Sequence, residues 1–247
     1  MTMTPLPARI ASPLHALVKR LRRRAALIRF ALGGDISQAG EVTCLQSLVD
    51  SAFPRSLVDV GAYDGVLNST SFAFARSGWR ALMIEPLPKP FQWLAQTHAS
   101  FPNVVCINRA CSNTTGRQPL RLGAAGDTGM TATLCTDGDE WFPERQRLGT
   151  IEVAVDTLTN ILAEQDWPQD FGFLLIDCEG MDYEVLLGLD FARYRPRVIV
   201  SEEYVWNKSK HDSKYRLLER QGYTLHAALG SNTIWRSTTD SYASKNT

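Results

Sequence analysis

After Pro54 the sequence alternates between short apolar runs and amphipathic segments, and this alternation restricts the possible folds more than any other feature. It is typical of an α/β domain built on a mostly parallel sheet. The final two runs predict an antiparallel pair that closes the sheet. The predicted strands are 56–60, 81–84, 103–107, 151–155, 171–176, 197–200, 223–227 and 233–235. The predicted helices between them are 68–76, 90–98, 158–164, 181–189 and 214–221.

Two helical segments are predicted before this domain. Ser12 and Pro13 can begin a helix that runs to Leu32, where Gly33 and Gly34 end it. A second helical stretch is expected from Asp35 to Phe53, before Pro54. We therefore predict a helical extension at 1–53, a domain at 54–236 and a polar tail at 237–247.

The first predicted helix combines an apolar stripe with an excess of basic residues. Residues 1–34 hold seven Lys and Arg and no acid, whereas the rest of the chain is mildly acidic. Three interpretations remain open for this helix: docking on the domain or a second subunit, contact with an anionic membrane, or nucleic-acid binding. The acidic balance of the main domain argues against extended nucleic-acid binding there. The stripe consists of Leu14, Val18, Leu21, Ala25, Ile28 and Leu32.

The cysteine pattern and hydropathy predict a cytoplasmic protein, with the inner membrane face as a further location if the basic helix binds lipid. The five cysteines include no C-x-x-C pair, so neither a disulfide framework nor a zinc site is expected. No apolar run reaches the roughly 18 residues that a membrane-spanning helix needs.

The first site signal lies at the end of the first predicted strand, in the run Asp59-Val60-Gly61-Ala62-Tyr63-Asp64-Gly65. Glycines here permit a tight strand-to-helix turn and a close approach of a ligand to the backbone. The spacing differs from the dinucleotide fingerprint and lacks the Lys of a P-loop. Taken alone, the run is weak support for a ligand site.

Two further acidic positions follow predicted strands. Glu85, before Pro86, ends the second strand, and a carboxylate there can accept hydrogen bonds from both hydroxyls of a ribose. Asp177 and Glu179 follow the most apolar strand, at the sheet edge where ligands of such folds bind. An ordinary strand end for Glu85 and helix capping by Glu179 are the structural alternatives.

Five runs in order resemble the FkbM family of methyltransferases over roughly residues 56–204. They are 58–65, Ile84-Glu85-Pro86, Asn108-Arg109-Ala110, Val155-Asp156-Thr157-Leu158 and Ile176-Asp177-Cys178-Glu179-Gly180. The resemblance implies a class I methyltransferase, Rossmann-like fold with a mostly parallel seven-stranded sheet and an antiparallel closing strand. It also implies S-adenosylmethionine as the cofactor and methyl transfer, most often to a hydroxyl of a sugar or natural product.

The resemblance also implies residue roles. The cofactor would lie against Asp59, Gly61, Ala62, Tyr63, Asp64, Gly65, Glu85, Pro86, Asn108, Arg109, Ala110 and Asp177. Tyr63-Asp64 departs from the small or amide residues expected in this loop, which leaves the contacts of Asp64 open. No metal site is predicted.

A hydroxyl acceptor needs a group that removes its proton. Asp177 is the first candidate, and the further candidates are Glu179, Glu202, Glu203 and His211. The irregular stretch 116–150, with Trp141-Phe142, is expected to form part of the acceptor site. Two other functions remain open: a binding module without catalysis, and a nicotinamide-dependent oxidoreductase.

Overall fold

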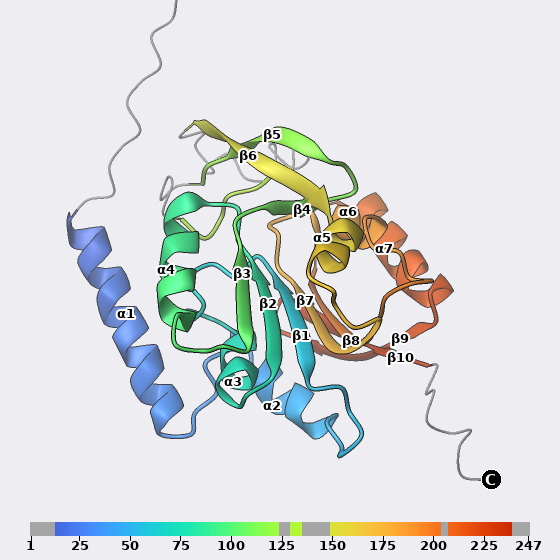
Figure 1. Cartoon of the computed structure of the whole chain (residues 1–247), viewed down its shortest axis with the longest axis horizontal. Helices are drawn as coiled ribbons and strands as arrows, with labels where there is room; N and C mark the ends of the chain where they lie inside the picture. Colours follow the sequence, from blue (N-terminus) through green and yellow to red (C-terminus); the bar gives the residue numbers. More distant parts are fainter. Residues whose placement is uncertain (1–12, 124–128, 135–148, 204–206, 239–247) are drawn as a thin grey trace, which may run out of the picture.

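The computed structural model describes residues 13–123, 129–134, 149–203 and 207–238, and the side chains from Leu17 onward. Its centre is a seven-stranded sheet in the order β3-β2-β1-β7-β8-β10-β9 (Figure 1). Only β10 runs opposite to the other six strands of this sheet, so the predicted fold class is confirmed. The strands are β1 (Ser56–Val60), β2 (Arg80–Ile84), β3 (Val104–Ile107), β7 (Asp170–Ile176), β8 (Arg195–Glu202), β9 (Tyr223–Leu229) and β10 (Asn232–Ser237).

The central strands of the sheet are buried on both faces because helices cover these apolar strands on each side. Neighbouring residues of β1 show this alternation: Val58 packs with α5, α6 and α7, whereas Leu57 packs with α2, α3 and α4. The helices are α2 (Glu41–Ser47), α3 (Ser71–Arg76), α4 (Pro88–His98), α5 (Leu158–Glu164), α6 (Asp182–Leu187) and α7 (Lys208–Arg220).

A second, three-stranded sheet lies beyond the end of β3 and is drawn at the top of Figure 1. Its order is β4-β6-β5, from β4 (Ala110–Ser112), β5 (Gly116–Arg121) and β6 (Thr150–Thr157). The sequence predicts β6, but β4 is not expected from it because three residues carry too little periodicity. The small sheet has its own apolar core around Leu120, Val153 and Val155.

The N-terminal helix α1 (Pro13–Ala31) lies along the outside of α4, as Figure 1 shows. The expected second helix is shorter than predicted: α2 begins only after Gly40, whose φ of 90° is left-handed. Before it, Asp35 accepts hydrogen bonds from Ser37 and Thr43 and forms a polar turn instead of helix. No helix among the described residues is long and apolar enough to cross a bilayer.

Candidate active site

The carboxyl ends of β1, β2 and β7 open into a cleft with two connected chambers. The first chamber extends to the small sheet, and the second extends toward β8 and β10. Four residues line both chambers: Gly61, Tyr63, Met130 and Asp177.

Gly61 makes the turn after β1 possible. Its φ is 95°, and a Cβ atom at this position would lie 2.0 Å from the backbone oxygen of Asp177. The two segments are this close because β1 and β7 are parallel neighbours, and the Asp177 N–H donates to the Val60 oxygen at 3.0 Å. A side chain at position 61 would therefore collide with the backbone of Asp177, so a contact within the protein requires the glycine. The same contact places Asp177 beside the loop.

Glu85 is held rigidly in the first chamber. It is 5% exposed, and its two carboxylate oxygens accept the backbone N–H groups of Tyr63 at 3.0 Å and Leu87 at 2.7 Å. Burial raises the pKa of Glu85 to about 7, although both N–H groups favour its charged form. Each oxygen keeps an acceptor site, so the carboxylate can receive two hydroxyl donors.

Asp59 lines the second chamber instead of the first. The Ser71 hydroxyl donates to it, and burial raises its pKa to about 6. Ala62, Asn68 and Ser69 lie in the same chamber. This chamber is therefore the more polar of the two and can accept a charged group.

Asp177 faces the open space of the cleft where the two chambers meet. Surrounding protein atoms, and then the negative charges of Glu179 and Asp182, raise its pKa above the usual range of an aspartate. Water in the cleft moderates that shift, because the side chain is exposed. Glu179 lines only the first chamber, from a left-handed conformation with φ of 51°.

Two members of the predicted cofactor loop turn away from the cleft. Asp64 is fully buried; one of its oxygens accepts N–H groups of Val66 and Leu67 at 2.9 Å, and the other lies 3.7 Å from Arg23 of α1. Gly65 faces α4, where a Cβ would lie 2.6 Å from His98. Neither Asp64 nor Gly65 lines a chamber, so the expectation that they contact the cofactor has no support from their positions.

Of the predicted cofactor residues after β2 and β3 besides Glu85, three line the first chamber and one does not. Pro86, Arg109 and Ala110 line the first chamber, as expected. Asn108 does not line it: its side-chain amide donates to the backbone oxygens of Glu85 at 2.8 Å and Pro86 at 3.0 Å. Asn108 thus braces the turn that carries Glu85.

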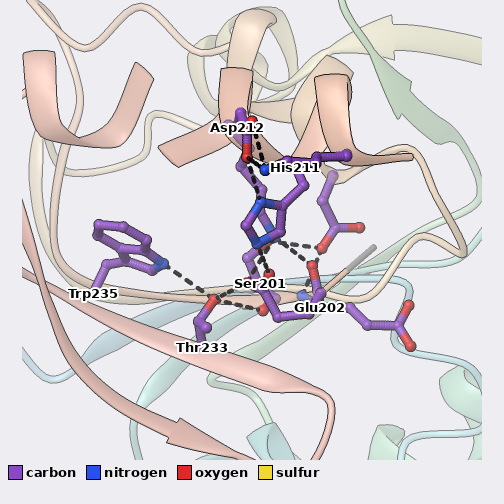
Figure 2. A network of polar contacts seen from close by, with 10 residues as sticks. Ser201, Glu202, His211, Asp212, Thr233 and Trp235 are labelled. Atoms are coloured by element: carbon purple, nitrogen blue, oxygen red, sulfur yellow. Dashed lines mark hydrogen bonds and ion pairs between the residues drawn. The ribbon is translucent and has the colours of Figure 1, made fainter. Parts of the chain in front are cut away.

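The remaining candidate bases line neither chamber; they are Glu202, Glu203 and His211. The Glu202 N–H donates to Asp182 at 2.8 Å. His211 on α7 lies between Asp212 at 3.1 Å and Glu203 at 2.8 Å, as Figure 2 shows for Asp212. All three belong to a polar network that joins α6, β8, α7 and β10. Trp141-Phe142 lie outside the described residues.

Lys214, which is fully buried, is the cation at the centre of this network. Its ammonium group donates to the Ser201 hydroxyl at 3.0 Å and to the backbone oxygen of Glu202. It also lies 3.3 Å from the carboxylate of Glu203. Because Lys214→Met removes a buried charge from Glu203 and a hydrogen-bond donor from Ser201 and Glu202, it should lower the free energy of unfolding by about 3 kcal/mol. Urea denaturation measures this change.

Lys208→Met on the same helix is the matched control. The Lys208 side chain is 86% exposed and pairs with Asp212 four residues on, so its loss should leave the urea midpoint nearly unchanged. Equal midpoints for the two variants would contradict a structural role for Lys214.

Several lining residues were not singled out from the sequence. Three of them come from the small sheet and the segment that bridges to it, namely Leu120, Thr133 and Leu134. The Thr133 hydroxyl donates to the backbone oxygen of Glu179 at 2.7 Å. Asn232, at the start of β10, lines the second chamber. The irregular composition of residues 116–150 was the one sequence feature that indicated some of these lining residues. Met130 from that stretch lines both chambers.

A sheet in this strand order, with a glycine turn after β1 and a buried carboxylate after β2, is the fold of a class I methyltransferase. The model of the family described as the methyltransferase FkbM domain matches residues 59–225, which is more than half of the chain. The chain therefore belongs to the FkbM family of S-adenosylmethionine-dependent methyltransferases. This result overturns the nicotinamide-dependent alternative. No curated protein sequence matches the chain.

Solved structures with a similar arrangement share little sequence with this chain. The methyltransferase FkbM from Methylobacillus flagellatus is 17% identical, with a TM-score of 0.48 over 77% of this chain and 45% of that one. This chain thus spans less than half the length of that relative. A methyltransferase from Geobacter sulfurreducens is 15% identical (TM-score 0.47; 94% and 91% covered). A putative O-methyltransferase from Klebsiella pneumoniae is 11% identical (TM-score 0.47; 93% and 98% covered).

Proposed function

We propose that this chain methylates a hydroxyl oxygen of a sugar or natural product, and that Asp177 accepts the hydroxyl proton. The observation that carries the proposal is the position of Asp177 at the meeting point of the two chambers. A carboxylate that is exposed to the cleft and has a raised pKa is suited to take a proton near neutral pH.

The residues of the cleft fit the cofactor that the family implies. In the first chamber, Glu85 can accept the ribose hydroxyls, and apolar side chains of Leu87, Leu120 and Leu134 can surround a purine. In the second chamber, Asp59 can receive an ammonium group. S-adenosylmethionine supplies a methyl group that is already activated by a positively charged sulfur.

The chain's own contribution is therefore alignment and proton acceptance. Gly61 lets the loop approach Asp177, and Glu85 holds the loop through the Tyr63 N–H. The Asp177 carboxylate orients the acceptor O–H and takes its proton while the oxygen gains the methyl group. Positioning of this kind accounts for much of the rate enhancement when one reactant is already activated.

An acceptor panel tests the proposal. The panel pairs glycosides that carry free hydroxyls with matched amino sugars and thiosugars, each incubated with methyl-labelled S-adenosylmethionine. We expect labelled methyl on oxygen, located by mass spectrometry and NMR. Methyl transfer to nitrogen or sulfur alone would contradict the proposal, and cofactor binding without transfer to any acceptor would favour the binding module.

A further inference from the structure

Helix α1 docks on the domain through its basic side, not through its apolar stripe. The ammonium group of Lys19 lies 3.3 Å from the centre of the Trp93 ring and 4.2 Å from that of Tyr63. Arg23 contacts Asp64 at 3.7 Å and donates to the Thr97 hydroxyl. These cation–π and ion contacts fix one face of α1 against α4 and the wall of the cleft.

Aromatic packing extends the same inner face toward the end of α1. Phe30 meets Phe72 edge to face at 5.0 Å between ring centres, and Ala26 packs into the same small cluster. The inner residues Lys19, Arg23, Ala26 and Phe30 follow one another at steps of four, three and four, which is one side of a helix.

The apolar stripe consequently points to solvent. Leu21 is 57% exposed, Ile28 53% and Leu32, directly after the helix, 84%; Leu17 and Val18 are exposed as well. With 100° between successive residues, Leu21 lies about 160° from Lys19 around the axis. An exposed row of large apolar side chains of this length marks an interaction surface.

Arginines flank the stripe on both sides. Helical geometry places Arg20 and Arg24 along one edge and Arg22 and Arg29 along the other, and all four are exposed. Residues 1–34 contain no acid that could neutralise them. A second copy docking through this stripe would bring eight arginines together, whereas an anionic lipid surface complements them.

We infer that the outer face of α1 binds an anionic membrane surface, with the stripe entering the acyl boundary and the four arginines at the level of the lipid phosphates. A helix of this kind lies in the plane of the interface and does not span it. Because Lys19 and Arg23 hold the inner face, the cleft wall at Tyr63 lies directly behind the membrane-bound helix. The inference does not depend on which acceptor is methylated.

Vesicle co-sedimentation of the full chain tests the inference. We expect sedimentation with vesicles of phosphatidylglycerol and phosphatidylcholine, little with phosphatidylcholine alone, and weaker binding at high salt. The double variant L21E/I28E should reduce affinity by roughly tenfold for each side chain withdrawn from lipid. Arg20→Gln and Arg24→Gln should each reduce it about fivefold.

Leu225→Glu is the matched control, because Leu225 on β9 is 47% exposed and lies away from α1. It should bind vesicles as the unchanged chain does, and unchanged melting temperatures verify the folding of every variant. Failure of the chain to sediment with anionic vesicles, or equal binding by L21E/I28E, would overturn the inference. A chain dimer that L21E/I28E converts to a monomer, without vesicle binding, would assign the face to a second copy.

Discussion

Replacing Asp177 with Asn should lower kcat by about 10²–10⁴-fold while leaving the affinity for S-adenosylmethionine within a few fold. Asn keeps the shape of the side chain and the backbone contact with Gly61, but it cannot accept the acceptor's proton. Single-turnover kinetics with a saturating acceptor separate this chemical step from binding. A variant that retains full kcat would refute proton acceptance by Asp177.

The pH profile provides a second readout for Asp177. Because surrounding protein atoms and the charges of Glu179 and Asp182 raise the pKa of Asp177, its deprotonated form is lost at a higher pH than for an ordinary aspartate, whose pKa is about 3.9. The rate should therefore rise with pH through that elevated pKa and level off above it. In Asp177→Asn this rise should disappear.

His211→Gln is the control for both measurements. His211 is the one histidine that sequence reasoning offered as a base, yet it lies in the network with Glu203 and Asp212. Its substitution should leave the kcat and the pH profile close to those of the unchanged chain. A large loss of kcat in His211→Gln, with unchanged stability, would move proton acceptance away from Asp177.

Replacing Glu85 with Ala should weaken the binding of S-adenosylmethionine by about 100-fold or more. Hydrogen bonds to a charged acceptor contribute about 1.5–3 kcal/mol each, and two ribose hydroxyls can donate to this carboxylate. The substitution also releases the N–H groups of Tyr63 and Leu87, which Glu85 holds at 3.0 and 2.7 Å. Isothermal calorimetry with S-adenosylhomocysteine measures the change.

A double-mutant cycle separates the ribose contact from loosening of the loop. In the unchanged chain, 2′-deoxy S-adenosylhomocysteine should bind more weakly than the parent compound. In Glu85→Ala this difference should vanish, because the partner of the hydroxyl is gone. Glu219→Ala, an exposed carboxylate on α7, is the control and should leave both affinities unchanged. If Glu85→Ala still binds the 2′-deoxy compound more weakly than the parent compound by the same factor as the unchanged chain does, the assignment of Glu85 to the ribose is wrong.

The affinity should also depend on pH near neutrality. The charged form of Glu85 is the better acceptor, and its pKa in the ligand-free protein is raised to about 7 by burial. Cofactor affinity should therefore fall as the pH drops below about 7, with proton release on binding. In Glu85→Ala this dependence should be lost.

The site was predictable where its residues sit at strand ends. Short apolar runs indicate β1, β2 and β7. In a parallel arrangement, the acids at or just after the ends of these strands lie at one edge of the sheet. Asp59, Glu85 and Asp177 were identified on that basis, and each lines a chamber. By contrast, Asp64 shares the loop with Tyr63 but points the other way, because its partner Arg23 lies far along the chain on α1.

The sequence by itself determined the α/β alternation, the glycine turn, the acids at the strand ends and the apolar stripe of α1, because these depend on contacts between near neighbours. Only the tertiary structure decided the strand order, with β10 inserted between β8 and β9, and the separation of β6 into a second sheet. It also decided that α1 turns its stripe outward, since Lys19 and Arg23 find rings and a carboxylate on distant segments. These features depend on contacts between residues far apart in the sequence, which a local sequence pattern does not indicate.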